Sequence, residues 1–270
     1  MKKILSLILA LTMIFAICCM AGCGGDTKDN DAASTPSKEE VNPVTTVTSG
    51  KLTMATNAYF PPYEYYEGEK IVGIDAEIAE AIAKKLNLTL EIKDMNFETI
   101  ITAVNAGDAD IGVAGMTVTQ DRLKEVDFSK SYANGVQAII VKEGSKITTA
   151  DDLYAEGANY KVGVQLGTTG DIYCTDDFGN DRVTQYANGN EAVVALLGGD
   201  VDCVIIDNEP AKSFVANNAG LKILETSYAD EDYAIAIKKG NTALKEAIDK
   251  AILELTADGT IDAIIAKYIK

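Results

Sequence analysis

Short apolar runs alternate with longer segments of helical periodicity from about residue 50 to the end of the chain. The first run, residues 51–56, predicts a β-strand. Residues 75–86 predict an amphipathic helix, because Ile78 and Ile82 recur every four residues, and Asp75 is expected to cap its N-terminus. Further strands are predicted over residues 88–92, 111–114, 137–141, 161–164 and 204–206. Strands that alternate with helices indicate an α/β architecture.

Two segments about 90 residues apart repeat one order of parts. Residues 97–116 (FETIITAVNAGDADIGVAGM) and 190–209 (NEAVVALLGGDVDCVIIDNE) each predict a helix, a Gly-Asp turn, a further Asp and an apolar strand. Helix–turn–strand units also recur by chance in α/β proteins. The spacing nevertheless favours one copy in each of two lobes. Ligands of open α/β sheets lie beyond the carboxyl ends of strands, so both copies would face one cleft.

A second pair of similar segments marks the passages of the chain between the lobes. Residues 131–144 (SYANGVQAIIVKEG) and 227–240 (SYADEDYAIAIKKG) each predict a strand that ends in Lys and Gly. The predicted fold is therefore two α/β lobes joined by two hinge strands. Lobe 1 is expected to be discontinuous, formed by residues 50–135 plus 235–270, and lobe 2 by residues 136–234.

The N-terminus has the pattern of an export signal. Two lysines precede an uncharged apolar run over residues 4–20, which is short for a spanning helix. Small residues followed by Cys23 resemble the lipobox of bacterial lipoproteins, so residues 1–22 are interpreted as a signal peptide and Cys23 as the acylated residue. An uncleaved signal or ordinary membrane anchor is the alternative. Residues 23–49, polar and rich in Gly, Ser, Thr and Pro, predict a flexible tether. The protein is then expected at the outer face of the cytoplasmic membrane, or on the periplasmic side in an organism with two membranes.

Composition narrows the function classes. The 270 residues carry a formal charge of −17, from 41 acidic and 24 basic residues, which would repel nucleic acid and anionic lipid. The chain has no histidine, which removes the commonest general base and the commonest zinc ligand. Asp176, Asp177 and Asp181 lack the spacing of a calcium-binding EF-hand loop. We expect no metal, no cofactor and a monomer.

The candidate binding residues follow predicted strands. Gly115, Thr117 and Arg122 come after the strand at 111–114, and a guanidinium can hold a carboxylate through two hydrogen bonds. A surface salt bridge is the alternative for Arg122. The only other arginine, Arg182, lies in a polar stretch and is expected to be a solvated loop residue.

The second half of the chain supplies complementary groups. Residues 162–173 (VGVQLGTTGDIY) lead through Thr168 and Thr169 into a helix, whose free N–H groups attract anions. No Lys follows the glycines, so a carboxylate is favoured over a phosphate. Asp207 ends an apolar strand and could pair with an ammonium or cap a helix. Phe60 and Phe97 could flank an aliphatic ligand or belong to the core.

Taken together, these stretches resemble the bacterial extracellular solute-binding proteins of family 3, the polar amino acid receptors of ABC transporters. The resemblance runs through most of residues 50–270 and rests on these motifs: ATNAYFPPYEY, IVGIDAEIAEAIAKKL, AGDADIGVAGMTVTQDR, VDFSKSY, KVGVQLGTTG, VDCVIIDNEP and LTADGTIDAIIAKY. It implies a trap-like fold that delivers an amino acid to the permease subunits of an importer.

The resemblance also implies roles. The α-carboxylate would be held by Arg122, Thr117 and the backbone at Thr168 and Thr169, and the α-ammonium by Asp207 and the Gly115 carbonyl. Phe60 and Phe97 would pack on either side. Asn57, Met116 and Gln165 complete the set of expected binding residues. Asn57 stands where receptors for cationic amino acids often have an acid, Ala114 where they often have Ser, and Gln165 where some neutral-ligand receptors have a base or an apolar residue. An uncharged polar ligand such as glutamine is favoured slightly over a basic one, which Glu64 could serve.

Two other functions are compatible with parts of the sequence. Secreted cyclohexadienyl or arogenate dehydratases share the implied fold and would need a positioned acid. A sensory ligand-binding domain would be joined to a membrane-spanning helix, and no second apolar run of spanning length follows the first. Cys174 and Cys203 both fall in the predicted lobe 2, where they could form a disulfide or remain buried thiols.

Overall fold

The computed structural model describes residues 44–225 and 228–269. The expected signal peptide, Cys23 and all but the last six residues of the expected tether lie outside the described residues. The strands are β1 Lys51–Thr56, β2 Tyr59–Phe60, β3 Glu64–Glu67, β4 Lys70–Val72, β5 Thr89–Asp94, β6 Ile111–Gly112, β7 Val126–Lys142, β8 Val162–Gln165, β9 Val183–Tyr186, β10 Cys203–Asp207, β11 Leu221–Ile223 and β12 Ala229–Lys238. The helices are α1 Ile74–Lys85, η1 Phe97–Thr99, α2 Ile100–Ala106, α3 Arg122–Glu125, η2 Ala150–Leu153, α4 Thr169–Phe178, α5 Gly189–Gly198, α6 Asn208–Asn217, α7 Thr242–Ala257 and α8 Thr260–Tyr268.

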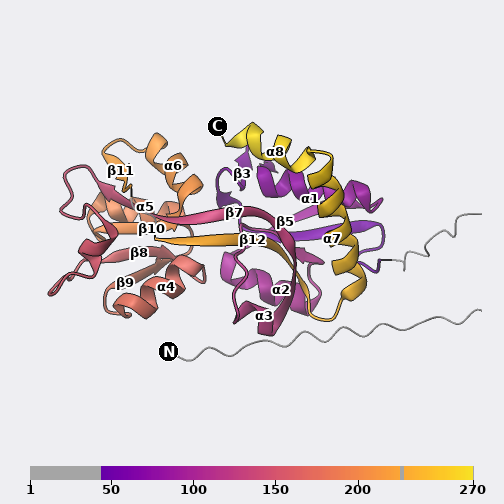
Figure 1. Ribbon diagram of the computed structural model, residues 1–270, viewed down its shortest axis with the longest axis horizontal. Helices are drawn as coiled ribbons and strands as arrows, with labels where there is room; N and C mark the ends of the chain where they lie inside the picture. The colour runs from indigo at the N-terminus through magenta and orange to yellow at the C-terminus, as the bar shows by residue number, and fades with distance from the viewer. Residues whose placement is uncertain (1–43, 226–227, 270) are drawn as a thin grey trace, which may run out of the picture. The chain divides into compact units, whose positions relative to one another are not determined.

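One long sheet carries two groups of parallel strands (Figure 1). Its order is β5-β1-β6-β12-β7-β10-β8-β9, with β11 paired to β7. The strands β5, β1 and β6 are parallel to one another, as are β10, β8 and β9. Between them, β7 and β12 run antiparallel to each other and to the strands beside them. We call β1–β6, α1–α3, α7 and α8 lobe 1, and β8–β11 and α4–α6 lobe 2; β7 and β12 join the lobes.

The internal repeat has a structural reason. In each copy a helix ends at a glycine in the left-handed region, Gly107 (φ 83°) or Gly199 (φ 89°). The Asp that follows holds the start of the neighbouring parallel strand. Asp110 accepts a hydrogen bond from the Thr53 N–H at 2.7 Å, and Asp202 accepts one from the Lys161 N–H at 2.7 Å. Each copy thus fixes the register of a pair of parallel strands, once in each lobe.

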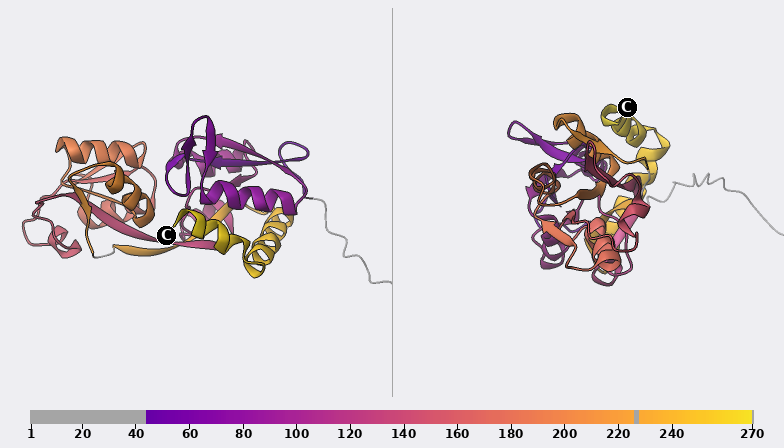
Figure 2. Two further views of the ribbon diagram at one scale, coloured as in Figure 1. Left: turned by 90° about the horizontal axis from the view of Figure 1, so that it is seen from above. Right: turned by 90° about the vertical axis from the view of Figure 1, so that its left-hand side faces the viewer.

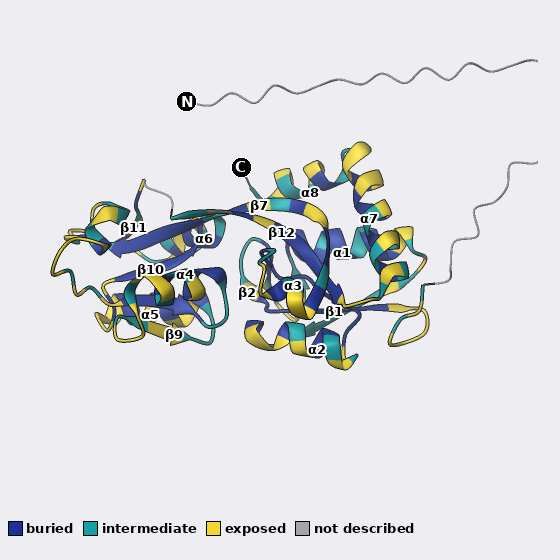
Figure 3. Cartoon of the chain, turned by 60° about the horizontal axis from the view of Figure 1, so that its bottom comes forward, coloured by how far each residue is buried: buried dark blue, intermediate teal, exposed yellow. Residues whose placement is uncertain are grey.

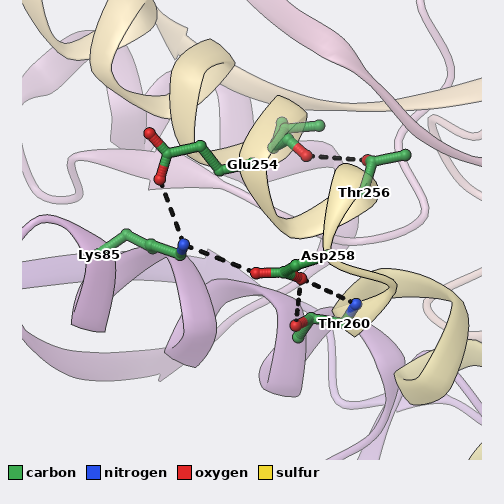
Figure 4. Close-up of polar contacts among 6 residues, drawn as sticks. Lys85, Glu254, Thr256, Asp258 and Thr260 are labelled. Carbon is green, nitrogen blue, oxygen red and sulfur yellow. Dashed lines mark hydrogen bonds and ion pairs between the residues drawn. The ribbon is translucent and has the colours of Figure 1, made fainter.

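The C-terminal helices return to lobe 1. Figure 2 shows α7 and α8 beside α1, and Ile248 and Leu255 belong to the same buried cluster as Ile78 and Ile82. At the surface, Lys85 pairs with Glu254 at 3.2 Å and with Asp258 at 3.7 Å (Figure 4). Exposed pairs of this kind contribute ~0–1 kcal/mol, so the buried apolar side chains provide most of the attachment.

Burial follows the two lobes. Strands are largely buried and helices expose their outer faces (Figure 3). The buried residues of two hydrophobic clusters lie within 52–132 and 233–261, which includes lobe 1 and the ends of β7 and β12 nearest to it. The buried residues of the other two clusters lie within 138–224. None of the helices within the described ranges is both long and apolar enough to span a bilayer.

The expected capping role of Asp75 is wrong. Gly73 is the N-cap of α1, with no side-chain cap, and Asp75 lies inside the first turn. Its buried carboxylate instead accepts hydrogen bonds from the Gly115 N–H at 2.7 Å and from the Tyr132 hydroxyl at 2.9 Å. Asp75 therefore ties α1 to the loop after β6 and to β7.

Candidate functional site

A cavity lies where the carboxyl ends of the parallel strands of both lobes meet. The segments that follow β1, β6, β8 and β10 reach it, as the topology of open α/β sheets predicts. The empty space in and around it, its open mouth included, is about 410 Å³. Its walls are formed by Asn57, Phe60, Glu64, Phe97, Ala114, Gly115, Thr117, Arg122, Gln137, Gln165, Thr168, Thr169, Ile206, Asp207, Glu231 and Tyr233.

Arg122 is the cation of this cavity. It is 7 % exposed, and its guanidinium donates to the Thr117 carbonyl at 2.8 Å and to the Gly167 carbonyl at 3.0 Å. No ion pair within 4 Å satisfies it among residues 44–225 and 228–269. Burial lowers the pKa of Arg122 to about 10, so the side chain remains charged at neutral pH. A buried cation without a carboxylate partner can bind an anion.

Aromatic rings shape the walls beside Arg122. The Phe97 ring centroid lies 5.3 Å from the Arg122 Cζ, so Phe97 both lines the cavity and contacts the guanidinium face. Phe60 stacks on Tyr63 with ring centroids 5.7 Å apart. Gly115, at φ 52°, lets the Phe60 ring approach, because a Cβ there would lie 2.9 Å from that ring. The two phenylalanines leave an apolar slot for the body of a ligand.

Asp207 is both a helix cap and a cavity residue. One carboxylate oxygen accepts from the Glu209 N–H at 3.1 Å, which caps α6. The other accepts from the Val136 N–H at 3.1 Å and from the Tyr233 hydroxyl. Burial raises the pKa of Asp207 to about 7, because desolvation disfavours the ionised carboxylate. A ligand ammonium would supply a compensating positive charge.

Polar groups of both lobes meet across the cavity. The Gln165 amide donates to the Asn57 side-chain oxygen at 2.9 Å, and the Asn57 amide donates to the Met95 carbonyl at 2.9 Å. Thr168 caps α4, which starts at Thr169. The first N–H groups of a helix have no acceptor in a preceding turn, so the start of α4 can bind an anion beside Arg122.

The structure therefore brings together ten of the eleven predicted ligand-binding residues. The exception is Met116, which is 1 % exposed and belongs to a hydrophobic cluster that includes Phe97 and Val126.

The expectation that Arg182 is a solvated loop residue is wrong: it is half-buried in lobe 2, where it donates to the carbonyls of Tyr160 and Leu153. Cys174 and Cys203 are free buried thiols in this structure, and burial raises the pKa of Cys203 to about 12.

Four cavity residues were missed as binding residues: Gln137, Ile206, Glu231 and Tyr233. Three of them lie on β7 or β12, the strands that contain the similar segments 131–144 and 227–240. The similarity of these segments predicted only that they connect the lobes. Glu231 is 6 % exposed and accepts from the Gln137 amide at 2.9 Å, while its other oxygen has no partner among the described residues.

Within the same described ranges, no group of three or more Cys, Asp or Glu side chains is arranged to hold a metal ion.

Comparisons with known proteins agree with this geometry. The family model of bacterial extracellular solute-binding proteins, family 3, matches residues 52–270. A probable histidine-binding protein of Neisseria gonorrhoeae is 32 % identical over 99 % of this chain and 96 % of its own length. The ABC transporter glutamine-binding protein GlnH of Bacillus subtilis is 31 % identical over 100 % of this chain and 98 % of its own.

A solved structure gives the same fold. An ancestral arginine-binding protein bound to glutamine superposes with a TM-score of 0.77 and 41 % identity, covering 82 % of this chain and 99 % of that one. The predicted fold of two α/β lobes joined by two strands is confirmed. The family match over nearly all of the described residues also confirms the resemblance, and the chain belongs to family 3 of the bacterial extracellular solute-binding proteins.

Proposed function

We propose that the chain is the receptor of an ABC importer, which binds an amino acid in the cavity between its lobes and delivers it to the permease. The observation that carries the proposal is the pairing of opposite charges inside one cavity. Among residues 44–225 and 228–269, the buried Arg122 guanidinium has no ion pair within 4 Å and neither has the buried Asp207 carboxylate. An amino acid zwitterion supplies both missing partners.

Each end of the ligand has a defined set of groups. The α-carboxylate is held by Arg122, the Thr117 hydroxyl and the N–H groups at the start of α4. The α-ammonium is held by Asp207 and the Gly115 carbonyl. Phe60 and Phe97 pack against the aliphatic part. With these roles, binding depends on the α-ammonium and α-carboxylate groups that all amino acids share.

Closure of the lobes accompanies binding in this proposal. We place the boundaries at residues 50–135 plus 235–270 for lobe 1 and 136–234 for lobe 2, with hinges near Gly135 and Asp232. The hydrophobic clusters separate close to these boundaries, within 52–132 plus 233–261 and within 138–224, which supports rigid lobes. A ligand that contacts both lobes stabilises the closed arrangement over an open one.

The relatives are named for different amino acids, histidine, glutamine and arginine, so their names support the class of ligand and leave its side chain undecided. They are named as binding proteins, which supports binding of an amino acid without a catalysed reaction.

We also propose that the protein is monomeric and lipid-anchored at Cys23. Replacement of Cys23 by Ala should release it from the membrane into the soluble fraction.

A thermal-shift screen against the twenty amino acids and cystine tests the function. A ligand at 100 times its dissociation constant adds ~2.7 kcal/mol to the free energy of unfolding. At least one amino acid should raise the melting temperature. If none does and the purified protein converts prephenate or arogenate, the chain is an enzyme and the proposal is wrong.

A further inference from the structure

A second hollow lies outside the amino acid cavity, where the end of η2, helix α4 and the start of β12 meet. The empty space in and around it, its open mouth included, is about 530 Å³. It is lined by Tyr154, Tyr173, Asp176, Asp177, Tyr228 and Ala229. None of these six residues lines the amino acid cavity, so the two hollows are separate.

Two tyrosine rings of this hollow are held in place although they reach the surface. Tyr154 is 54 % exposed, yet its ring packs on Phe178 with the centroids 5.0 Å apart. Phe178 also contacts the Tyr228 ring, with the centroids 6.5 Å apart. The Tyr154 hydroxyl donates to the Asp177 carboxylate at 2.6 Å, and the Tyr228 hydroxyl donates to the same oxygen. Aromatic side chains fixed in this way lose little conformational freedom when a ligand binds.

The charged groups of the hollow are all negative. No Lys or Arg lines it among the described residues, and no ion pair within 4 Å joins Asp176 or Asp177 to a cation within 44–225 and 228–269. Arg182 instead covers the Phe178 ring, with its Cζ 4.6 Å from the centroid, and donates to backbone carbonyls. Carboxylates and aromatic ring faces attract a cation and repel an anion.

The two carboxylates also lie at the unfavourable end of a helix. Helix α4 spans Thr169–Phe178, and Asp176 and Asp177 belong to its last turn, which has no basic residue. The C-terminal end of a helix carries a partial negative charge, so carboxylates are unfavourable there and cations are favourable. The folded chain therefore bears an electrostatic cost at this hollow that a bound cation would relieve.

We infer that this hollow is a second binding site, for a small quaternary ammonium cation. The rings of Tyr154, Tyr173 and Tyr228 would surround the methylated head, which needs no hydrogen bond. Asp176 and Asp177 supply the opposite charge. The inference goes beyond the proposed function, because this site shares no lining residue with the amino acid cavity.

Choline and its neutral carbon isostere, in which a tert-butyl group replaces the trimethylammonium head, test the charge requirement. Titrations are followed in the NMR signals of the tyrosine rings, with the Tyr154 signal assigned through Tyr154→Phe. Choline should bind about 10-fold or more tighter than the isostere, because the rings and the carboxylates attract only the charged ligand. An isostere that binds as tightly as choline, or the absence of saturable choline binding, would overturn the inference.

Removal of one carboxylate should change binding and stability in opposite directions. Asp176→Asn should weaken choline binding about threefold or more, because one of the two negative charges is lost. Its melting temperature should stay at or above the wild-type value, because that charge no longer opposes the C-terminal end of α4. Asp200→Asn is the matched control, since it makes the same charge change at an exposed position of lobe 2 that does not line the hollow.

Asp200→Asn should bind choline within about twofold of the wild type, because salt screens exposed charges that are not close to the ligand. An equal loss in Asp176→Asn and Asp200→Asn would assign the effect to the net charge of the protein and overturn the site.

Asp207→Asn distinguishes this site from the amino acid cavity, which also has acidic walls. This variant should bind choline as the wild type does. If it loses choline binding while Asp176→Asn keeps it, the cation binds in the amino acid cavity and the inference is wrong. Neither result decides the proposed receptor function, which is measured with amino acids.

Discussion

The Arg122 guanidinium of lobe 1 donates a hydrogen bond to the Gly167 carbonyl of lobe 2 at 3.0 Å. The same guanidinium donates to Thr117 at 2.8 Å on its own side of the cavity. Arg122 thus contacts both lobes at the point where a ligand carboxylate would bind. In the proposed function, this position would link recognition of the ligand to closure of the lobes.

Replacement of Arg122 by Ala should weaken amino acid binding by about 30-fold or more, because a desolvated carboxylate left without its partner costs ~2–5 kcal/mol. Titration calorimetry measures the loss. Lys124→Ala, an exposed position on the same short helix, is the matched control and should bind as the wild type does. Full affinity in Arg122→Ala would remove this residue from the site.

Asp207→Asn should also weaken binding, and more for ligands with an α-ammonium than for analogues without one. The neutral amide keeps the cap of α6 but no longer pairs with a cation. Affinities for an amino acid and its des-amino analogue, measured on both proteins, give the comparison. Equal losses for the two ligands would argue against an ammonium contact.

Affinity for an amino acid should fall as the pH drops below about 7. Burial raises the pKa of Asp207 to about 7, and a bound ammonium would favour the ionised carboxylate. Protons therefore compete with the ligand below pH 7, with a limit of about tenfold per pH unit, and cease to compete above pH 8. Binding measured from pH 5 to 9 tests this, and a profile of Asp207→Asn as steep as that of the wild type would assign the effect to another group.

Gly135→Ala should impair both stability and binding. A Cβ at this position would lie 2.6 Å from an oxygen of Asp207 and also against the Tyr233 hydroxyl, so β7 or Asp207 must move. We expect a loss of ~1–3 kcal/mol in the free energy of unfolding, typical of overpacked sites. Gly198→Ala is the control, because its Cβ would have only ordinary contacts within 4 Å, and it should unfold at or above the wild-type denaturant concentration.

Gln165→Ala should shift the lobes toward an open arrangement. The hydrogen bond of 2.9 Å from Gln165 to Asn57 joins the two lobes directly. Its loss should increase the mean distance between spin labels on α2 and α5, which belong to different lobes. Addition of the bound amino acid should shorten that distance in the wild type and decrease the radius of gyration in solution scattering. Distances that are the same with and without ligand would contradict hinge closure.

Local sequence patterns determined most of the secondary structure. The predicted helix at 75–86 is α1 at Ile74–Lys85, and the predicted strand at 51–56 is β1 with the same ends. Periodicity succeeds here because each element buries one face. The internal repeat was informative for a similar reason: Gly107 and Asp110, like Gly199 and Asp202, end a helix and start a parallel pair by contacts within a short stretch.

Residue type and position also indicated most of the cavity, because ligands of α/β sheets lie at strand ends. Asn57, Gly115, Gln165 and Asp207 each follow or end a strand, and all four line the cavity. Met116 shows the limit of that argument. It lies between two cavity residues, yet its side chain belongs to a buried hydrophobic cluster. Only the path of the backbone decides which of these successive residues faces the cavity and which faces the core.

The tertiary structure alone decided which charges are compensated. Asp75 has a sequence signature of a helix cap but binds Gly115 and Tyr132, and Glu64 lies buried beside it. Glu231 and Gln137 enter the cavity from strands that the sequence marked only as connections. A sequence shows which residues can be charged, but the cost of each charge depends on burial and on partners far away along the chain, such as Gln137 and Glu231, which are 94 residues apart. The class of protein follows from local patterns, whereas the compensation of each buried charge depends on side chains that only the fold brings together.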